Sequence, residues 1–221
     1  NAINALRSGR DLQIFTSGAE FFVPQADLDP ITPSNITVKS ATRRGSKFGI
    51  RPQAAEGGTL FIQRQGKALR EMLFSDVELS YVANNISLLS SHMIVDPQRM
   101  ALRAATDTTE GDLLLIVNGS SSTGYRADSA GFTTDGDFVD VGVDLEDVYV
   151  VVKRTIGGST KYYLELFDDD RTTDSAIQYY NSPASPDQAL PGNTTAGSLS
   201  HLEGKTVKII RDDIVDTDAT V

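Results

Sequence analysis

A β-like run, a glycine-containing turn and a second β-like run recur along this 221-residue chain, and this repetition limits its fold more than any other feature. The runs are 11–15 with 19–23, 59–63 with 67–74, 112–117 leading into Asn118-Gly119, and 147–152 with 161–167. Apolar or alternating runs joined by glycine turns are typical of β-hairpins. We therefore predict an all-β fold.

The spacing of the hairpins favours propeller-like blades. The first runs align at Leu12, Leu60, Leu113 and Val148, which are 48, 53 and 35 residues apart. Propeller blades repeat every 40–50 residues or so and contain about four strands. Shorter β-like runs at 36–39 and 138–143 can complete such blades. Because four units are fewer than most propellers contain, we expect an incomplete propeller; a β-sandwich with irregular loops is the alternative.

Helix is expected to be scarce. Residues 75–92 form the one long candidate, since Ser75 and Glu78 resemble a capping box. Apolar residues then recur at helical spacing, at Leu79, Val82, Ile86 and Leu89. The asparagine and β-branched residues of this stretch disfavour a long helix, so we predict one or two short helices.

Composition shifts divide the chain into three parts. We expect a partial propeller-like domain over 1–180, a Pro/Ser/Gly-rich loop or linker over 181–197, and over 198–221 a strand that opens a second β domain. The chain does not begin with Met and carries no secretion signal, so we expect it to be a piece of something longer.

The composition excludes several functional classes. Lys and Arg number 20 against 30 Asp and Glu, a net charge of −10; this is too little charge on too apolar a chain for disorder. No apolar run is long enough to span a membrane as a helix. The absence of cysteine excludes disulfides, thiolate zinc sites and cysteine nucleophiles.

No catalytic, cofactor-binding or metal-binding residue can be nominated. The chain has no Gly-x-Ser-x-Gly elbow, phosphate loop or dinucleotide fingerprint. The two histidines, His92 and His201, are about a hundred residues apart without a supporting motif. A carboxylate pair for glycoside hydrolysis stays open, because its separation is a three-dimensional quantity.

Acidic clusters are the features that most resemble a metal site. Asp168 to Asp174 follows a predicted strand and offers the oxygen ligands that Ca²⁺ prefers. The segment lacks the Gly and spaced Glu of an EF-hand, and Arg171 opposes a cation, so we favour a solvated turn. The same interpretation applies to Asp135–Asp137 and Asp144–Asp147.

One local stretch is basic. Residues 39–48 hold four cations, at Lys39, Arg43, Arg44 and Lys47. Contact with phosphate is conceivable, but four charges in a chain of net charge −10 make a weak nucleic-acid footprint. The stretch therefore favours an exposed loop that forms salt bridges between subunits.

Several segments of the chain have a distinctive sequence: 9–18 with 20–25, 31–35, 66–71, 85–92 and 201–207. These segments resemble the tail nozzle proteins of short-tailed bacteriophages, also called tail tubular protein B, and related phage tail hub proteins. The resemblance covers most of 1–120 and 146–211. It departs over 120–130, where the family has a further apolar strand and a Trp-containing strand; this chain has no Trp. One blade is therefore incomplete there, or its residues are absent from this chain.

The resemblance implies a structural virion protein rather than an enzyme. Such a protein is built around a β-propeller and assembles as a ring, usually a hexamer, beneath the portal and adaptor, with the adaptor and the tail fibres as partners. Phage DNA leaves through its channel without sequence-specific binding. We expect Asp and Glu to be enriched toward the ring axis, because basic groups would hold DNA phosphates; the alternative is that the negative charge only keeps the outer surface soluble.

Two other classes remain as alternatives. A receptor-binding or adhesin module would use exposed loop aromatics, for which Tyr125, Tyr179 and Tyr180 are the candidates. A tail-associated glycan hydrolase would need a carboxylate pair in a concave pocket.

Overall fold

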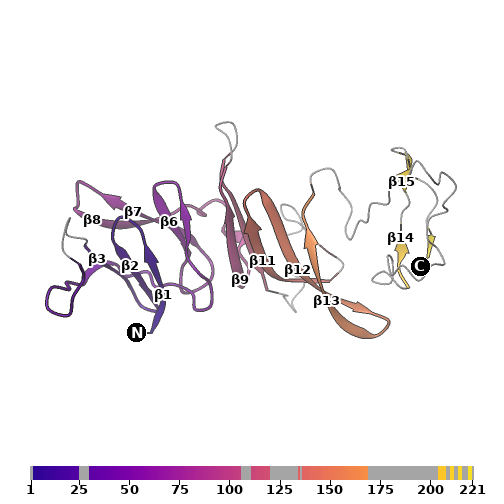
Figure 1. Cartoon of the computed structure of the whole chain (residues 1–221), viewed down its shortest axis with the longest axis horizontal. Helices are drawn as coiled ribbons and strands as arrows, with labels where there is room; N and C mark the ends of the chain where they lie inside the picture. The colour runs from indigo at the N-terminus through magenta and orange to yellow at the C-terminus, as the bar shows by residue number, and fades with distance from the viewer. Residues whose placement is uncertain are drawn as a thin grey trace.

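The described part of the chain is almost entirely β-strand (Figure 1). The computed structural model describes residues 2–24, 30–105, 111–119, 134, 136–168, 204–207, 210–211, 214–215 and 219–220. Antiparallel sheets of two to four strands account for its architecture. Within these residues the helical content is a single 3-10 turn, Ser91–Met93. The predicted all-β class is confirmed.

The first sheet contains four antiparallel strands in sequence order. They are β1 (Ile3–Ser8), β2 (Leu12–Thr16), β3 (Glu20–Val23) and β4 (Lys39–Thr42). The predicted hairpin over 11–23 is confirmed as β2 and β3. Strand β1 was not predicted, and β4 begins at the last residue of the expected run 36–39.

The second sheet repeats this arrangement. Its strands are β5 (Gln53–Ala55), β6 (Gly58–Ile62), β7 (Leu69–Ser75) and β8 (Ser80–Asn85), again paired in sequence order. The predicted hairpin over 59–74 is confirmed as β6 and β7. Two successive four-stranded meanders have the strand number and order of propeller blades.

The long helical candidate over 75–92 is instead the β7–β8 hairpin followed by the short 3-10 turn. Ser75 and Glu78 do interact as expected of a cap, because the Glu78 backbone N–H donates to Ser75 Oγ at 3.3 Å. This contact closes a hairpin turn rather than a helix. The pairing of β7 with β8 over six residue pairs overrides the helical spacing of the apolar residues.

A two-stranded sheet and a three-stranded sheet follow. Strands β9 (Pro97–Arg103) and β10 (Leu113–Asn118) form a hairpin. The run at 112–117 therefore pairs with the strand before it. Strands β11 (Asp137–Asp144), β12 (Asp147–Ile156) and β13 (Ser159–Leu166) form the last large sheet, and the predicted hairpin with its Gly157-Gly158 turn is confirmed.

Short strands mark the C-terminal region. They are β14 (Thr206–Val207), β15 (Ile210–Arg211), β16 (Ile214–Val215) and β17 (Ala219–Thr220), paired as β14 with β17 and β15 with β16. The predicted linker 181–197 and the segment 120–130 lie outside the described residues. The division into domains therefore stays a prediction.

The first two sheets pack face to face through an aromatic cluster. Phe15 and Phe22 of the first sheet meet Phe61, Met72 and Tyr81 of the second. The ring centroids of Phe15 and Phe61 are 5.2 Å apart, and those of Phe22 and Tyr81 are 5.0 Å apart. Such tilted and edge-on pairs are the favoured aromatic arrangements.

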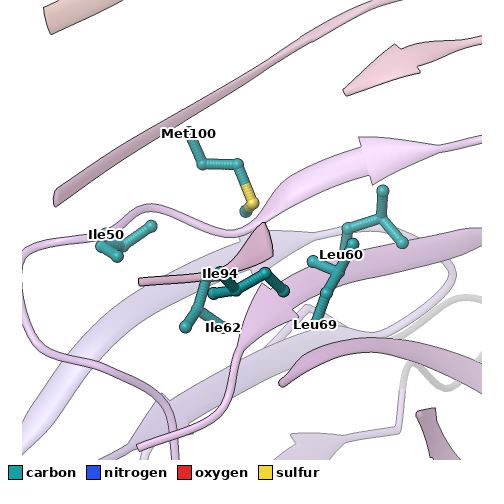
Figure 2. Close-up of a cluster of buried hydrophobic side chains, with 6 residues drawn as sticks. All are labelled: Ile50, Leu60, Ile62, Leu69, Ile94 and Met100. Atoms are coloured by element: carbon teal, nitrogen blue, oxygen red, sulfur yellow. The ribbon is translucent and has the colours of Figure 1, made fainter. Parts of the chain in front are cut away.

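The other face of the second sheet is buried as well. Leu60 and Ile62 alternate with Phe61 along β6, so their side chains project to the opposite face. There they join a cluster with Ile50, Leu69, Ile94 and Met100 (Figure 2). Because Met100 belongs to β9, this cluster joins the second sheet to the β9–β10 hairpin. The second sheet is therefore a central layer with two buried faces.

The β6–β7 turn depends on Gly66, whose φ is +69°. A Cβ at this position would also lie 3.2 Å from Lys47 Nζ and 3.3 Å from Pro97 Cδ. We expect Gly66→Val to lower the free energy of unfolding by about 1–3 kcal/mol through backbone strain. Chemical denaturation of purified protein measures this directly.

The matched control is Gly142→Val in β11, where a Cβ would meet open space and φ is not in the left-handed region. We expect this variant to be as stable as the parent or slightly more so. Equal stability of the two variants would contradict the assigned role of Gly66.

Candidate functional site

The described residues bring together no nucleophile, base and orienting group. His92 lies exposed in the 3-10 turn, and His201 lies outside the described residues. Within the described ranges, no group of three or more His, Asp or Glu could hold a metal ion. Residues 169–174 of the acidic segment, interpreted above as a solvated turn, lie outside these ranges, as do Asp135 and the three tyrosines that are candidates under the receptor-binding alternative.

Within the described ranges, the one carboxyl group with a raised pKa is buried in the first sheet. The Glu20 side chain is 0% exposed. Its Oε2 accepts hydrogen bonds from the Thr42 hydroxyl and from the Arg44 backbone N–H, and its Oε1 has no hydrogen-bond partner within the described residues. Burial raises the pKa of Glu20, and the hydrogen bonds oppose that rise only in part.

Raised carboxyl pKa values often mark catalytic acids. Glu20 has no accessible surface through which a substrate could reach it. Its hydrogen bonds instead hold the start of the loop that connects the first and second sheets. We therefore assign Glu20 a structural role.

That connecting loop packs against the β6–β7 turn. The Arg64 backbone N–H donates to the Gly45 carbonyl at 2.9 Å, and the Lys47 N–H donates to the Ile62 carbonyl at 2.9 Å. The loop also reaches the first sheet, because the Ser46 N–H donates to the Thr16 carbonyl. Two basic segments distant in sequence thus form one surface.

We call this the basic loop surface and define it by four exposed cations and one exposed aromatic residue. Its members are Arg43, Arg44, Arg64, Lys67 and Phe48, the last of which is 80% exposed. None of the four cations forms an ion pair within the described residues. Lys47, which also belongs to the basic stretch 39–48, does form an ion pair, because its Nζ lies 2.8 Å from Asp96 Oδ1. Lys39 lies in β4.

An exposed acidic turn connects β11 and β12. We define the acidic hairpin tip as Asp144, Leu145, Glu146 and Asp147, all of which are exposed. Asp144 and Asp147 face each other across the hairpin, an arrangement in which like charges repel. The two carboxylates, Asp147 foremost, raise the pKa of the nearby Tyr149 phenol. Within the described residues no cation pairs with the tip.

Asp137 and Asp140 of the same sheet do have partners. Lys153 Nζ lies 3.7 Å from Asp137 Oδ2, and Arg99 Nε lies 3.6 Å from Asp140 Oδ1. The second of these pairs links β9 to β11. These acidic residues therefore serve the fold, whereas those of the hairpin tip do not.

A polar hollow lies beside the first sheet, with Arg10, Asp11, Lys39 and Phe74 among its lining residues. The Arg10 guanidinium lies 4.0 Å from the Phe74 ring centroid, a cation–π contact. Asp11 accepts a hydrogen bond from the Tyr81 hydroxyl at 2.9 Å. Arg10, Asp11 and Phe74 are thus already engaged in internal contacts, and the described lining of the hollow brings no reactive pair together.

Comparison with known proteins adds no family assignment: no family model and no curated protein matches the chain. In the described part of the structure, no helix is long and apolar enough to cross a membrane.

The raised pKa of Glu20 gives a testable pH dependence. Above the ordinary glutamate pKa the unfolded chain releases this proton before the folded chain does, so the free energy of unfolding falls as pH rises. The loss is about 1.4 kcal/mol for each unit by which folding raises the pKa. We expect Glu20→Gln to lack this loss and to gain stability relative to the parent between pH 4 and 8, as measured by denaturation at each pH.

Glu56→Gln is the matched control, because Glu56 is exposed in the β5–β6 turn. Its stability should follow the parent at every pH. If the free energies of unfolding of Glu20→Gln and of the parent change with pH in parallel over this range, the Glu20 carboxyl does not cause the loss of stability at higher pH.

Proposed function

We propose that this chain is a structural protein of a phage tail, a nozzle or hub subunit that assembles with copies of itself around a channel for DNA. The observation that carries the proposal is the pair of successive four-stranded meanders packed face to face. This arrangement supports the blade-like architecture implied by the resemblance to tail nozzle proteins.

The distribution of buried groups also supports a scaffold. The second sheet uses both faces for packing, with aromatic residues on one and aliphatic residues on the other. A conduit requires such rigid layers and interaction surfaces between copies. Its partners would be further copies of the chain, a portal-side adaptor, tail fibres and the DNA that passes through.

The first prediction from this proposal concerns location. Quantitative mass spectrometry of purified virions should find this protein at a fixed copy number, and antibody labelling in electron micrographs should place it on the tail. Its absence from virions that retain their other tail proteins would refute the proposal. Release of sugar from host glycans by the purified chain would favour the hydrolase alternative.

The second prediction concerns DNA. Because the chain carries a net charge of −10, DNA should be repelled at long range and should pass without tight adhesion. In a low-salt gel-shift assay we expect no retention of two duplexes of unrelated sequence. Retention that weakens with added salt would show that a basic surface grips the DNA backbone.

A further inference from the structure

The charge of this chain is divided unevenly along its length. Residues 1–103 contain 12 Lys and Arg against 9 Asp and Glu, whereas residues 104–221 contain 8 against 21. The basic loop surface belongs to the first part and the acidic hairpin tip to the second. Each is exposed, and within the described residues neither pairs with the other or with any other opposite charge.

The two surfaces are also similar in composition apart from their sign. At the tip, Leu145 is 88% exposed beside three carboxylates, and in the loops Phe48 is 80% exposed among four cations. An apolar centre within a polar rim is the usual composition of a protein interface. Opposite potentials on two such surfaces favour association and fix its orientation.

We propose that the basic loop surface of one copy binds the acidic hairpin tip of a second copy. This inference rests on the proposed assembly of copies and names the surfaces that would join them. Because the two surfaces lie on different elements, the contact is heterologous: each copy uses its tip on one neighbour and its loops on the other. Contacts of this kind close into a ring when the rotation between copies allows it.

Nucleic acid is the other polyanion that such loops could bind. The second copy is favoured because the chain itself supplies the complementary charge at an exposed turn. The excess negative charge of residues 104–221 would also oppose the approach of DNA.

Charge reversal tests the contact on the full chain. The loop variant is Arg43→Glu/Arg64→Glu/Lys67→Glu, which turns the loop surface from four positive charges to a net charge of −2, and the tip variant is Asp144→Lys/Glu146→Lys/Asp147→Lys, which turns the tip from −3 to +3. We expect sedimentation velocity to show that the parent associates and that each variant associates about tenfold more weakly or worse. Added salt should weaken the association of the parent.

A mixture of the two variants gives the sharpest result. The loop variant presents two acidic surfaces and the tip variant presents two basic ones, so each variant should stay dissociated alone. Mixed in equal amounts, they should associate by alternating along the assembly. The control Glu56→Lys/Glu78→Lys changes two exposed carboxylates in other turns and should associate like the parent.

Four results would overturn the inference. If the parent associates and both reversals leave it unchanged, other surfaces join the copies, and the proposed function stands. If the mixture of variants fails to associate, or if the parent is a monomer at every concentration, the two surfaces do not bind each other. Mass spectrometry and antibody labelling of virions then test the proposed function independently. If a gel shift shows DNA retention that the loop variant loses, the surface binds nucleic acid.

Discussion

Burial of both faces of the β5–β8 sheet is the constraint on which the rest of the structure depends. Phe61 packs toward the first sheet while Leu60 and Ile62 pack toward β9, and all three are nearly inaccessible to solvent. Each buried side chain of this size contributes about 1.5–3 kcal/mol. The second sheet therefore needs a neighbour on either side. Because successive side chains of β6 project to opposite faces, the first sheet covers one face and the β9–β10 hairpin covers the other.

The loop at 43–47 shows how this layering creates a surface. Glu20 and Thr16 hold it to the first sheet, and Ile62 and Arg64 hold it to the second. At Gly45 a Cβ would lie 2.5 Å from the Ser17 carbonyl oxygen, so only glycine permits the loop to approach this closely. Arg43 and Arg44, just before Gly45, are exposed at a point where the backbone is held between the two sheets.

Sequence patterns predicted the elements whose signals are local. The hairpins at 11–23, 59–74 and 147–167 were predicted from two runs and a glycine turn. Strands such as β5 and β9 were missed, because β5 is short and β9 carries charged residues within its run. The basic stretch at 39–48 was recognised, but Arg64 and Lys67 join it only through tertiary hydrogen bonds, which no spacing in the sequence reveals. Glu20 was missed for the same reason, since its burial depends on the packing of sheets.

The meander order of the strands has a consequence for how the chain folds. Within the two four-stranded sheets, every strand pairs with its immediate neighbour in sequence. Apart from the 24–38 connection between β3 and β4, the loops that must close are short, so the contact order within each sheet is low. As the chain emerges from the ribosome, the first sheet can form before the second is complete and then serve as the surface on which the second assembles. Growth in this direction leaves one apolar face exposed at a time, which limits the opportunity for aggregation during synthesis.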